Sequence, residues 1–86
     1  MSADKISPAN AFGKVLRELR VQRGQTQETL AFESSLDRTY ISLLELGKRS
    51  PTLDTILALC GALDISLSLL AQRLEECLRE HQTETP

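Results

Sequence analysis

Aromatic residues, histidine and cysteine are scarce in this sequence, and each shortage excludes a class of structure or chemistry. Aromatic side chains make up 3% of the 86 residues, so a hydrophobic core has to be aliphatic and mainly leucine. The one histidine, His81, lies in a polar C-terminal segment, and Cys60 and Cys77 are spaced unlike zinc ligands. We therefore predict no catalytic site, no metal site and no cofactor.

Long apolar runs are also missing. No stretch of about 18 apolar residues exists, which excludes a conventional membrane-spanning helix. The first ten residues, MSADKISPAN, lack the apolar segment of a secretory signal. From this we expect a cytoplasmic protein without a membrane partner.

Alternation of period two, which would indicate strands, is absent, and helical periodicity fills most of the chain. The three prolines and four glycines are expected near the ends of short helices. We predict an all-α fold in which residues 1–86 form a single domain, with residues 1–6 and 81–86 as flexible tails.

The first predicted helix follows Ser7-Pro8, where either Ser7 or Asn10 is the N-cap and Pro8 suits the first helical position. Gly24 is expected to end it. Its apolar residues recur at i, i+3, i+4 and i+7, which indicates one buried face: Phe12, Val15, Leu16 and Leu19.

Residues 26–47 read as two short helices joined by a tight turn. Thr26 and Asp37 are the expected N-caps, and Gly47 is expected to end the second helix in a left-handed conformation. The inward-facing positions are Leu30, Ala31, Leu36, Ile41 and Leu44. This is the pattern of a helix-turn-helix, whose second helix enters the major groove of DNA.

A fourth helix is expected after the cap Thr52, with an apolar face made of Leu53, Ile56, Leu57, Cys60 and Leu63. Cys60 is interpreted as a small buried hydrophobic residue.

The fifth predicted helix covers residues 67–80, after the cap Ser66. Its apolar stripe runs for more than three turns: Leu67, Leu70, Ala71, Leu74, Cys77 and Leu78. A stripe that outruns the core of a small domain favours pairing with a second copy of the chain. The alternative is that its far half folds back on the first helix.

Charge is divided unevenly along the chain, although the formal net charge is −2. Residues 10–50 hold seven basic and five acidic side chains, whereas residues 51–86 hold two basic and six acidic ones. This asymmetry is typical of a domain with one side facing DNA, although solvated surface charge predicts something similar.

Four sequence blocks resemble the lambda-repressor-like helix-turn-helix family, also called the XRE or Cro/repressor type. They are the LR.LR of the first helix, the Q..LA that opens the second, YIS..E.GKR.P.L.T.L, and the ALDIS turn into the fifth helix. The resemblance covers residues 12–70. It implies a compact five-helix DNA-binding domain. Within this family the chain resembles small phage repressors and restriction–modification controller proteins.

The resemblance also implies roles for individual residues. Gln27 matches the residue that binds a DNA phosphate and braces a base-reading side chain, while Arg38 and Thr39 match the first base-reading residues of the recognition helix. Arg20 and Glu45 match a structural salt bridge. The full set expected at DNA is Thr26, Gln27, Arg38, Thr39, Tyr40, Ser42, Leu43, Lys48 and Arg49.

Two roles are open for Tyr40: contact with the DNA backbone, or packing on the core with its hydroxyl exposed.

The chain also departs from the family pattern. Ser35 stands where glycine is common, so a left-handed conformation there would cost about 1 kcal/mol. Leu43 and Leu46 stand at positions that are often polar, and Leu43 either contacts a thymine methyl group or forms an apolar patch with Leu46 for a protein partner.

The sequence thus predicts a DNA-binding transcriptional regulator that acts as a homodimer on a pseudo-palindromic operator, with no small-molecule ligand. The expected dimer contacts are Leu67, Leu70, Leu74, Cys77 and Leu78. The alternative is an antitoxin-like or other protein-interaction module that uses the fifth helix or the Leu43/Leu46 patch.

Overall fold

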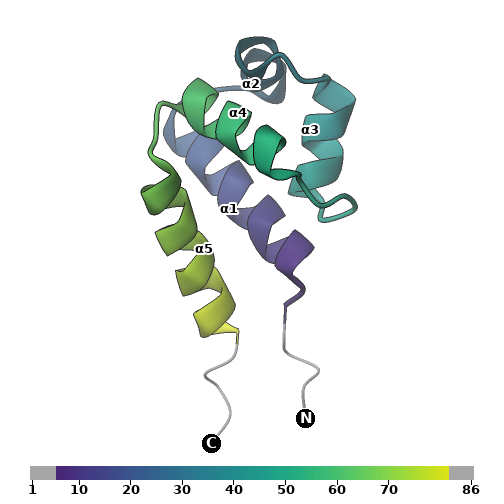
Figure 1. The fold of residues 1–86 in the computed structure, drawn as a ribbon. Helices are drawn as coiled ribbons and strands as arrows, with labels where there is room; N and C mark the ends of the chain where they lie inside the picture. The colour runs from purple at the N-terminus through teal and green to yellow at the C-terminus, as the bar shows by residue number, and fades with distance from the viewer. Residues whose placement is uncertain (1–5, 82–86) are drawn as a thin grey trace, which may run out of the picture.

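The computed structural model describes residues 6–81, which form five α-helices (Figure 1). They are α1 (Pro8–Gln22), α2 (Gln27–Ser34), α3 (Arg38–Glu45), α4 (Leu53–Leu63) and α5 (Leu67–Glu80). The all-α prediction is confirmed, and the bounds of the fifth helix agree with those expected. Residues 1–5 and 82–86, most of the two predicted tails, lie outside the described residues.

Two residues assigned to the tails belong to the folded part instead. Ile6 packs against the core, and His81 caps α5 with its Nδ1 2.9 Å from the Cys77 carbonyl oxygen. The folded part therefore includes one more residue at each end than the sequence indicated.

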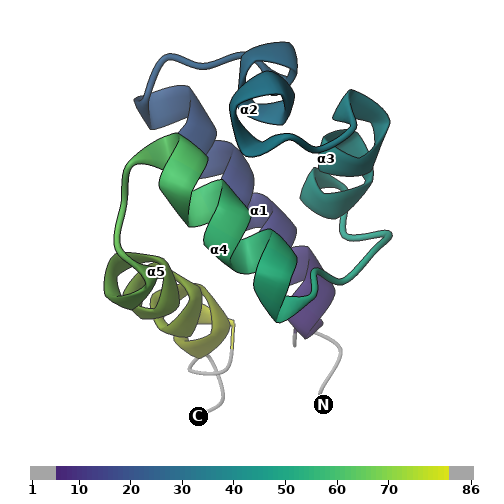
Figure 2. The ribbon, with the colours of Figure 1, turned by 45° about the horizontal axis from the view of Figure 1, so that its top comes forward.

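The first helix, α1, is the element on which α3 and α5 pack (Figure 2). The second helix contacts α3 and α4, and α4 leads through a short turn into α5. No single helix among the described residues meets the length and apolarity needed to cross a membrane. Only α4 and α5 taken together do so, across a bend of 107°.

Four of the helices begin at a hydroxyl side chain that accepts a backbone N–H three residues later. The donor–acceptor distances are 3.1 Å at Ser7, 3.0 Å at Thr26, 3.1 Å at Thr52 and 3.0 Å at Ser66. Ser7, and not Asn10, is thus the cap of α1. Each cap satisfies an N–H group that has no partner within its helix.

Aliphatic side chains from all five helices form one buried core. The faces predicted for α1 and for residues 26–47 are confirmed, with Leu36 partly buried at the edge. Cys60 is also buried, as predicted. The buried hydrophobic residues are Ala11, Phe12, Val15, Leu16, Leu19, Leu30, Ala31, Ile41, Leu44, Leu59, Cys60, Leu63, Leu70 and Cys77.

The apolar face predicted for α4 was wrong at two positions. Leu53 is 63% exposed and Leu57 is 48% exposed, whereas Leu59, which was not expected in the core, is 1% exposed. The helix is apolar almost all round, so periodicity alone did not fix which side faces inward.

A glycine in the middle of α1 also differs from expectation, because glycines were assigned to helix ends. A Cβ atom on Gly13 would lie 2.6 Å from the Glu45 carbonyl oxygen and would also overlap that of Leu44. Gly13 therefore lets the backbones of α1 and α3 approach closely. Gly47 does end α3 with a left-handed φ of 74°, as predicted.

The stripe on α5 is partly used within the subunit. Leu70 and Cys77 are 3% and 7% exposed, and Leu74 and Leu78 pack partly against the core. Leu67, at 44% exposed, faces outward. Leu70 and Cys77 are thus largely covered within the subunit, and their contribution to a dimer interface stays a prediction.

Candidate nucleic-acid interface

Helices α2 and α3 form a helix-turn-helix around a left-handed serine. Ser35 has φ 61° and ψ 33°, and the next residue closes the turn by donating from Leu36 N to the Ala31 carbonyl oxygen at 3.0 Å. The conformation anticipated for Ser35 is therefore present, with a cost of about 1 kcal/mol relative to an ordinary backbone conformation. Ala31 is 6% exposed and leaves room for the neighbouring elements to approach.

A salt bridge joins the end of α1 to the end of α3. The Arg20 guanidinium donates from Nε to Glu45 Oε2 at 2.6 Å and from Nη2 to Glu45 Oε1 at 3.1 Å. The two side chains are 11% and 4% exposed, so the pair is largely removed from water. Arg20 Nη1 also donates to the Gln25 carbonyl oxygen at 2.8 Å, which ties in the loop before α2. The salt bridge implied by the family resemblance is thus present.

The same carboxylate extends the network to the exposed end of α3. Gln27 donates from Nε2 to Glu45 Oε1 at 3.0 Å, and Arg38 donates from Nη1 to Gln27 Oε1 at 3.4 Å. Arg38 is the first residue of α3 and is exposed. A hydrogen-bonded chain therefore runs from the interior of the helix bundle to a surface arginine.

The side chains that begin α3 lie at the surface of the domain. Arg38 and Thr39 are exposed and belong to a helix whose Ile41 and Leu44 are buried. Asp37 occupies the N-cap position, as predicted, but its side chain makes no capping hydrogen bond to the helix. The leading side chains of α3 are free to meet a ligand.

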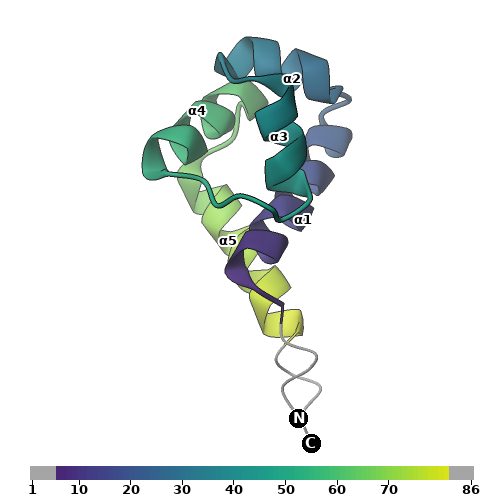
Figure 3. The same cartoon turned by 90° about the vertical axis from the view of Figure 1, so that its right-hand side faces the viewer.

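A loop leads from the other end of α3 to α4 (Figure 3). Two basic residues lie at its start. Lys48 and Arg49 are exposed, and the Arg49 guanidinium carbon lies 5.5 Å from the centroid of the Tyr40 ring. Tyr40 is half-buried, so its ring both packs on the core and supports a cation. Positive charge thus flanks α3 at both ends.

The remaining residues expected at this surface are less free. Thr26 is exposed, but its hydroxyl caps α2 and lies 3.0 Å from the Thr29 hydroxyl. Ser42 and Leu43 are half-buried, and Leu46 is 61% exposed. The nine predicted residues therefore lie at the N-cap of α2, on α2, on α3 and in the loop after α3, and they differ in their exposure to solvent.

Sequence reasoning missed two features of this region. It assigned Glu45 to the salt bridge alone, although Glu45 also holds Gln27. It also passed over Phe32, which is 86% exposed on α2. The signal for Phe32 was available, because Leu30, Ala31 and Ser34 define the buried side of α2 and exclude position 32 from it.

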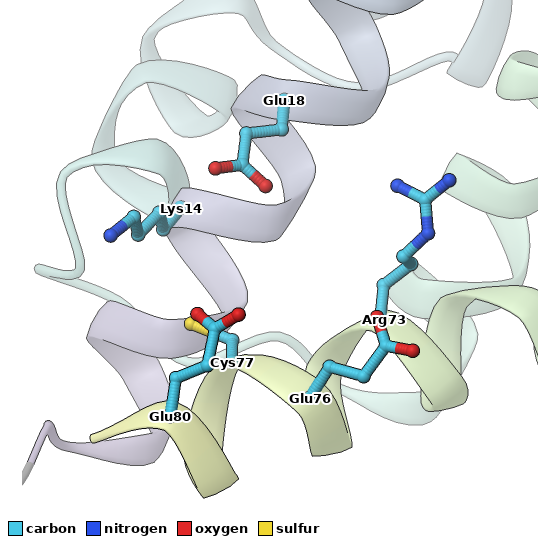
Figure 4. Close-up of a pocket in the computed structure, with 6 residues that line it drawn as sticks. All are labelled: Lys14, Glu18, Arg73, Glu76, Cys77 and Glu80. Atoms are coloured by element: carbon cyan, nitrogen blue, oxygen red, sulfur yellow. The ribbon is translucent and has the colours of Figure 1, made fainter. Parts of the chain in front are cut away.

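A pocket of about 230 Å³ lies elsewhere, between α1 and α5 (Figure 4). Its lining carries both signs of charge: Lys14, Glu18, Arg73, Glu76, Cys77 and Glu80. Burial raises the pKa of the Cys77 thiol, which keeps it protonated and weakly nucleophilic. No group of residues suited to hold a metal ion occurs within residues 6–81.

These features define a class of protein, namely a helix-turn-helix DNA-binding domain. The family model described as "Helix-turn-helix" matches residues 16–70, and the chain belongs to this XRE/Cro–lambda-repressor-like family. It is accordingly a DNA-binding transcriptional regulator and not an enzyme.

Among its relatives are controller proteins of restriction–modification systems. The chain is 44% identical to control protein C.BamHI of Bacillus amyloliquefaciens over 55 residues, which cover 63% of this chain and 68% of that protein. Its structure is similar to that of C.AhdI from Aeromonas hydrophila, with a TM-score of 0.70 and 50% identity over 72% of this chain and 94% of the other.

A third similar structure is the tetramer of the restriction–modification controller protein C.Esp1396I in complex with its natural 35-base-pair operator. The TM-score is 0.81, with 30% identity over 86% of this chain and 97% of the other. Structures of C.Esp1396I variants with an arginine, a threonine or a tyrosine replaced at three consecutive positions are also similar, with TM-scores of 0.78, 0.81 and 0.84. Arg38-Thr39-Tyr40 has the same order of residue types.

Proposed function

We propose that this regulator reads a specific operator through the first turn of α3, which lies in the major groove. The observation that carries the proposal is the exposed Arg38 at the start of α3, held by Gln27 from the neighbouring helix. Arg38 would donate two hydrogen bonds to O6 and N7 of a guanine, and Thr39 would contact the adjacent base edge. The arginine–threonine–tyrosine order shared with the altered positions of C.Esp1396I supports this assignment.

Phosphate contacts would come from both sides of α3. Gln27 keeps a second N–H on Nε2 after its bond to Glu45, and it stands at the start of α2, where backbone N–H groups also favour an anion. Lys48 and Arg49 would contact the phosphates beyond the far end of α3. Thr26, Tyr40 and Ser42 would make backbone contacts, and Leu43 would lie against the groove.

The functional unit we propose is a homodimer. Each subunit would place one α3 in the major groove, so two-fold symmetry predicts a pseudo-palindromic operator with half-sites roughly 34 Å apart. The outward surface of α5 around Leu67, Leu74 and Leu78 supplies the proposed contact. C.Esp1396I, which binds its operator as a tetramer, supports assembly on DNA as the working state.

As a regulator of transcription it would act inside the cell, where its operator lies, and its occupancy would follow its own concentration and the arrangement of its sites. The proposed function includes no small-molecule ligand. Its relation to controller proteins and small repressors favours control of a nearby promoter.

Binding to duplex DNA at several salt concentrations tests the proposal. With about six to ten phosphate contacts, the affinity of the dimer should fall by roughly 10³ or more between 50 and 200 mM salt. Replacing Arg38 and Gln27 together by alanine should abolish specific binding while the circular dichroism spectrum stays helical. Specific binding that survives both changes would refute the assigned surface.

The exposure of Leu46 favours one alternative. At 61% exposed and beside the half-buried Leu43, it would suit a protein partner of the antitoxin kind. That reading would take precedence if no duplex from a randomised pool were enriched at 50 mM salt.

A further inference from the structure

The Glu45 carboxylate lies beneath the proposed recognition surface and receives three hydrogen bonds. Its Oε2 accepts from Arg20 Nε at 2.6 Å, and its Oε1 accepts from Arg20 Nη2 at 3.1 Å and from Gln27 Nε2 at 3.0 Å. The side chain is 4% exposed. Glu45 is therefore fixed in position by two other elements and does not face solvent, so it cannot itself read a base.

The contact with the Glu45 carboxylate determines which way the Gln27 amide points. An ionised carboxylate only accepts hydrogen bonds, so Gln27 must turn its Nε2 toward Glu45 and its Oε1 away from it. That oxygen then accepts from Arg38 Nη1 at 3.4 Å. The opposite amide orientation would set two acceptors together at Glu45 and two donors together at Arg38, because a guanidinium has donors only.

We infer that Glu45 is a positioning residue for base recognition, acting through Gln27 to hold the Arg38 guanidinium in one orientation before DNA arrives. This inference rests on the proposed function, in which Arg38 reads a base. An arginine oriented in advance loses less rotamer freedom on binding. The gain in binding free energy is largest for the base that Arg38 bonds bidentately. The orientation of Arg38 therefore contributes to discrimination between bases as well as to affinity.

The variant Glu45→Gln separates this role from a merely structural one. An amide nitrogen replaces one accepting oxygen, so the donors of Arg20 and Gln27 meet a single acceptor and Gln27 is released or turned over. The preference for the best base pair over the other three at the Arg38 position should then fall about tenfold, within the range supplied by one bidentate contact.

The measurement uses four duplexes that differ only at the base pair where Arg38→Ala loses its preference. Two control variants accompany Glu45→Gln. Glu75→Gln makes the same chemical change on the exposed face of α5, and Ser66→Ala lowers stability by removing the cap of α5. Both should keep the wild-type preference among the four duplexes. In the Arg38→Ala background, Glu45→Gln should cause no further loss of preference.

If Glu45→Gln weakened binding to all four duplexes by the same factor, as expected for Ser66→Ala, the inference would be overturned. If Glu45→Gln does not fold, Glu45→Asp keeps a carboxylate opposite Arg20 but withdraws it from Gln27. It should lose the same preference, and an unchanged preference would overturn the inference as well. Failure of the proposed function has a different signature, since the wild type would then show no base preference that Arg38→Ala removes.

Discussion

Gly13 of α1 and Leu44 of α3 mark the point where the two helices meet backbone to backbone. A single added carbon on Gly13 would overlap the carbonyl oxygens of Leu44 and Glu45. Because Glu45 closes the network to Gln27 and Arg38, this contact sets the position of the whole recognition surface relative to α1.

The variant Gly13→Ala should therefore be destabilised, since backbone carbonyls cannot rotate away as a flexible side chain would. Overpacking of this kind costs about 1–3 kcal/mol, and each kcal/mol lowers the Tm of such a domain by roughly 4–8 °C. Gly61→Ala is the matched control. Gly61 is exposed on α4 with open space around its Cβ position, so alanine there should raise stability by about 0.5–1 kcal/mol. Thermal unfolding of both variants measures the difference, and a neutral Gly13→Ala would show that the helices separate at no cost.

The Tyr40 ring beneath Arg49 predicts different effects for two substitutions. Tyr40→Phe keeps the ring and its attraction for the guanidinium, whereas Tyr40→Leu removes it, and an exposed cation–π contact is worth about 0.5–1 kcal/mol. The leucine variant should therefore bind operator about two- to fivefold more weakly than the phenylalanine variant. Equal losses in both variants, measured by fluorescence anisotropy, would instead assign the effect to a direct contact of the hydroxyl with DNA.

The proposed dimer surface can be tested with two exposed leucines. Leu67→Glu at the start of α5 should give a monomer in sedimentation experiments, because a charge would be placed in an apolar contact. Leu53→Glu on α4 introduces the same charge at a similarly exposed leucine and should leave the dimer intact. The reverse pattern would move the interface from α5 to α4. Leu74→Glu and Leu78→Glu should also give monomers, although both residues pack partly on the core and the variants must first be shown to fold.

Both cysteines should react slowly with thiol reagents until the protein unfolds. Burial raises the pKa of the Cys60 and Cys77 thiols, so the native state holds their protons more tightly than the unfolded state does. Their contribution to stability is complete below the ordinary thiol pKa of 9.0 and is lost as pH rises above it through the raised values. Denaturant unfolding measured on both sides of pH 9 should show this fall, and Cys60→Ala/Cys77→Ala should reduce it. Rapid labelling of Cys77 in the native protein would contradict the burial described.

Much of this fold was predictable because local signals agreed. Hydroxyl caps, helical periodicity and the glycine after α3 each depend on neighbouring residues only, so Thr26, Thr52 and Gly47 could be assigned from sequence. The inward side of α4 could not, because leucine or isoleucine lies on nearly every side of it and only tertiary packing selects Leu59 over Leu57.

The candidate site was predictable as a set of residues but not as a network. Arg20 and Glu45 were paired through family resemblance, and the individual roles of Gln27 and Arg38 followed from it. The structure adds that the Glu45 carboxylate contacts both Arg20 and Gln27. This arrangement depends on the close approach of α1 and α3 at Gly13, for which the sequence carries no local signal. Likewise, the partial use of the α5 stripe within the subunit depends on how α5 crosses α1, which periodicity does not specify.

The most direct test of the central claim is selection of bound duplexes from a fully randomised library at low salt. We expect enrichment of one pseudo-palindromic site, with half-sites about one helical turn apart, and loss of the preferred guanine when selection is repeated with Arg38→Ala. Enrichment of no sequence, or of the same site by the wild type and Arg38→Ala, would contradict it.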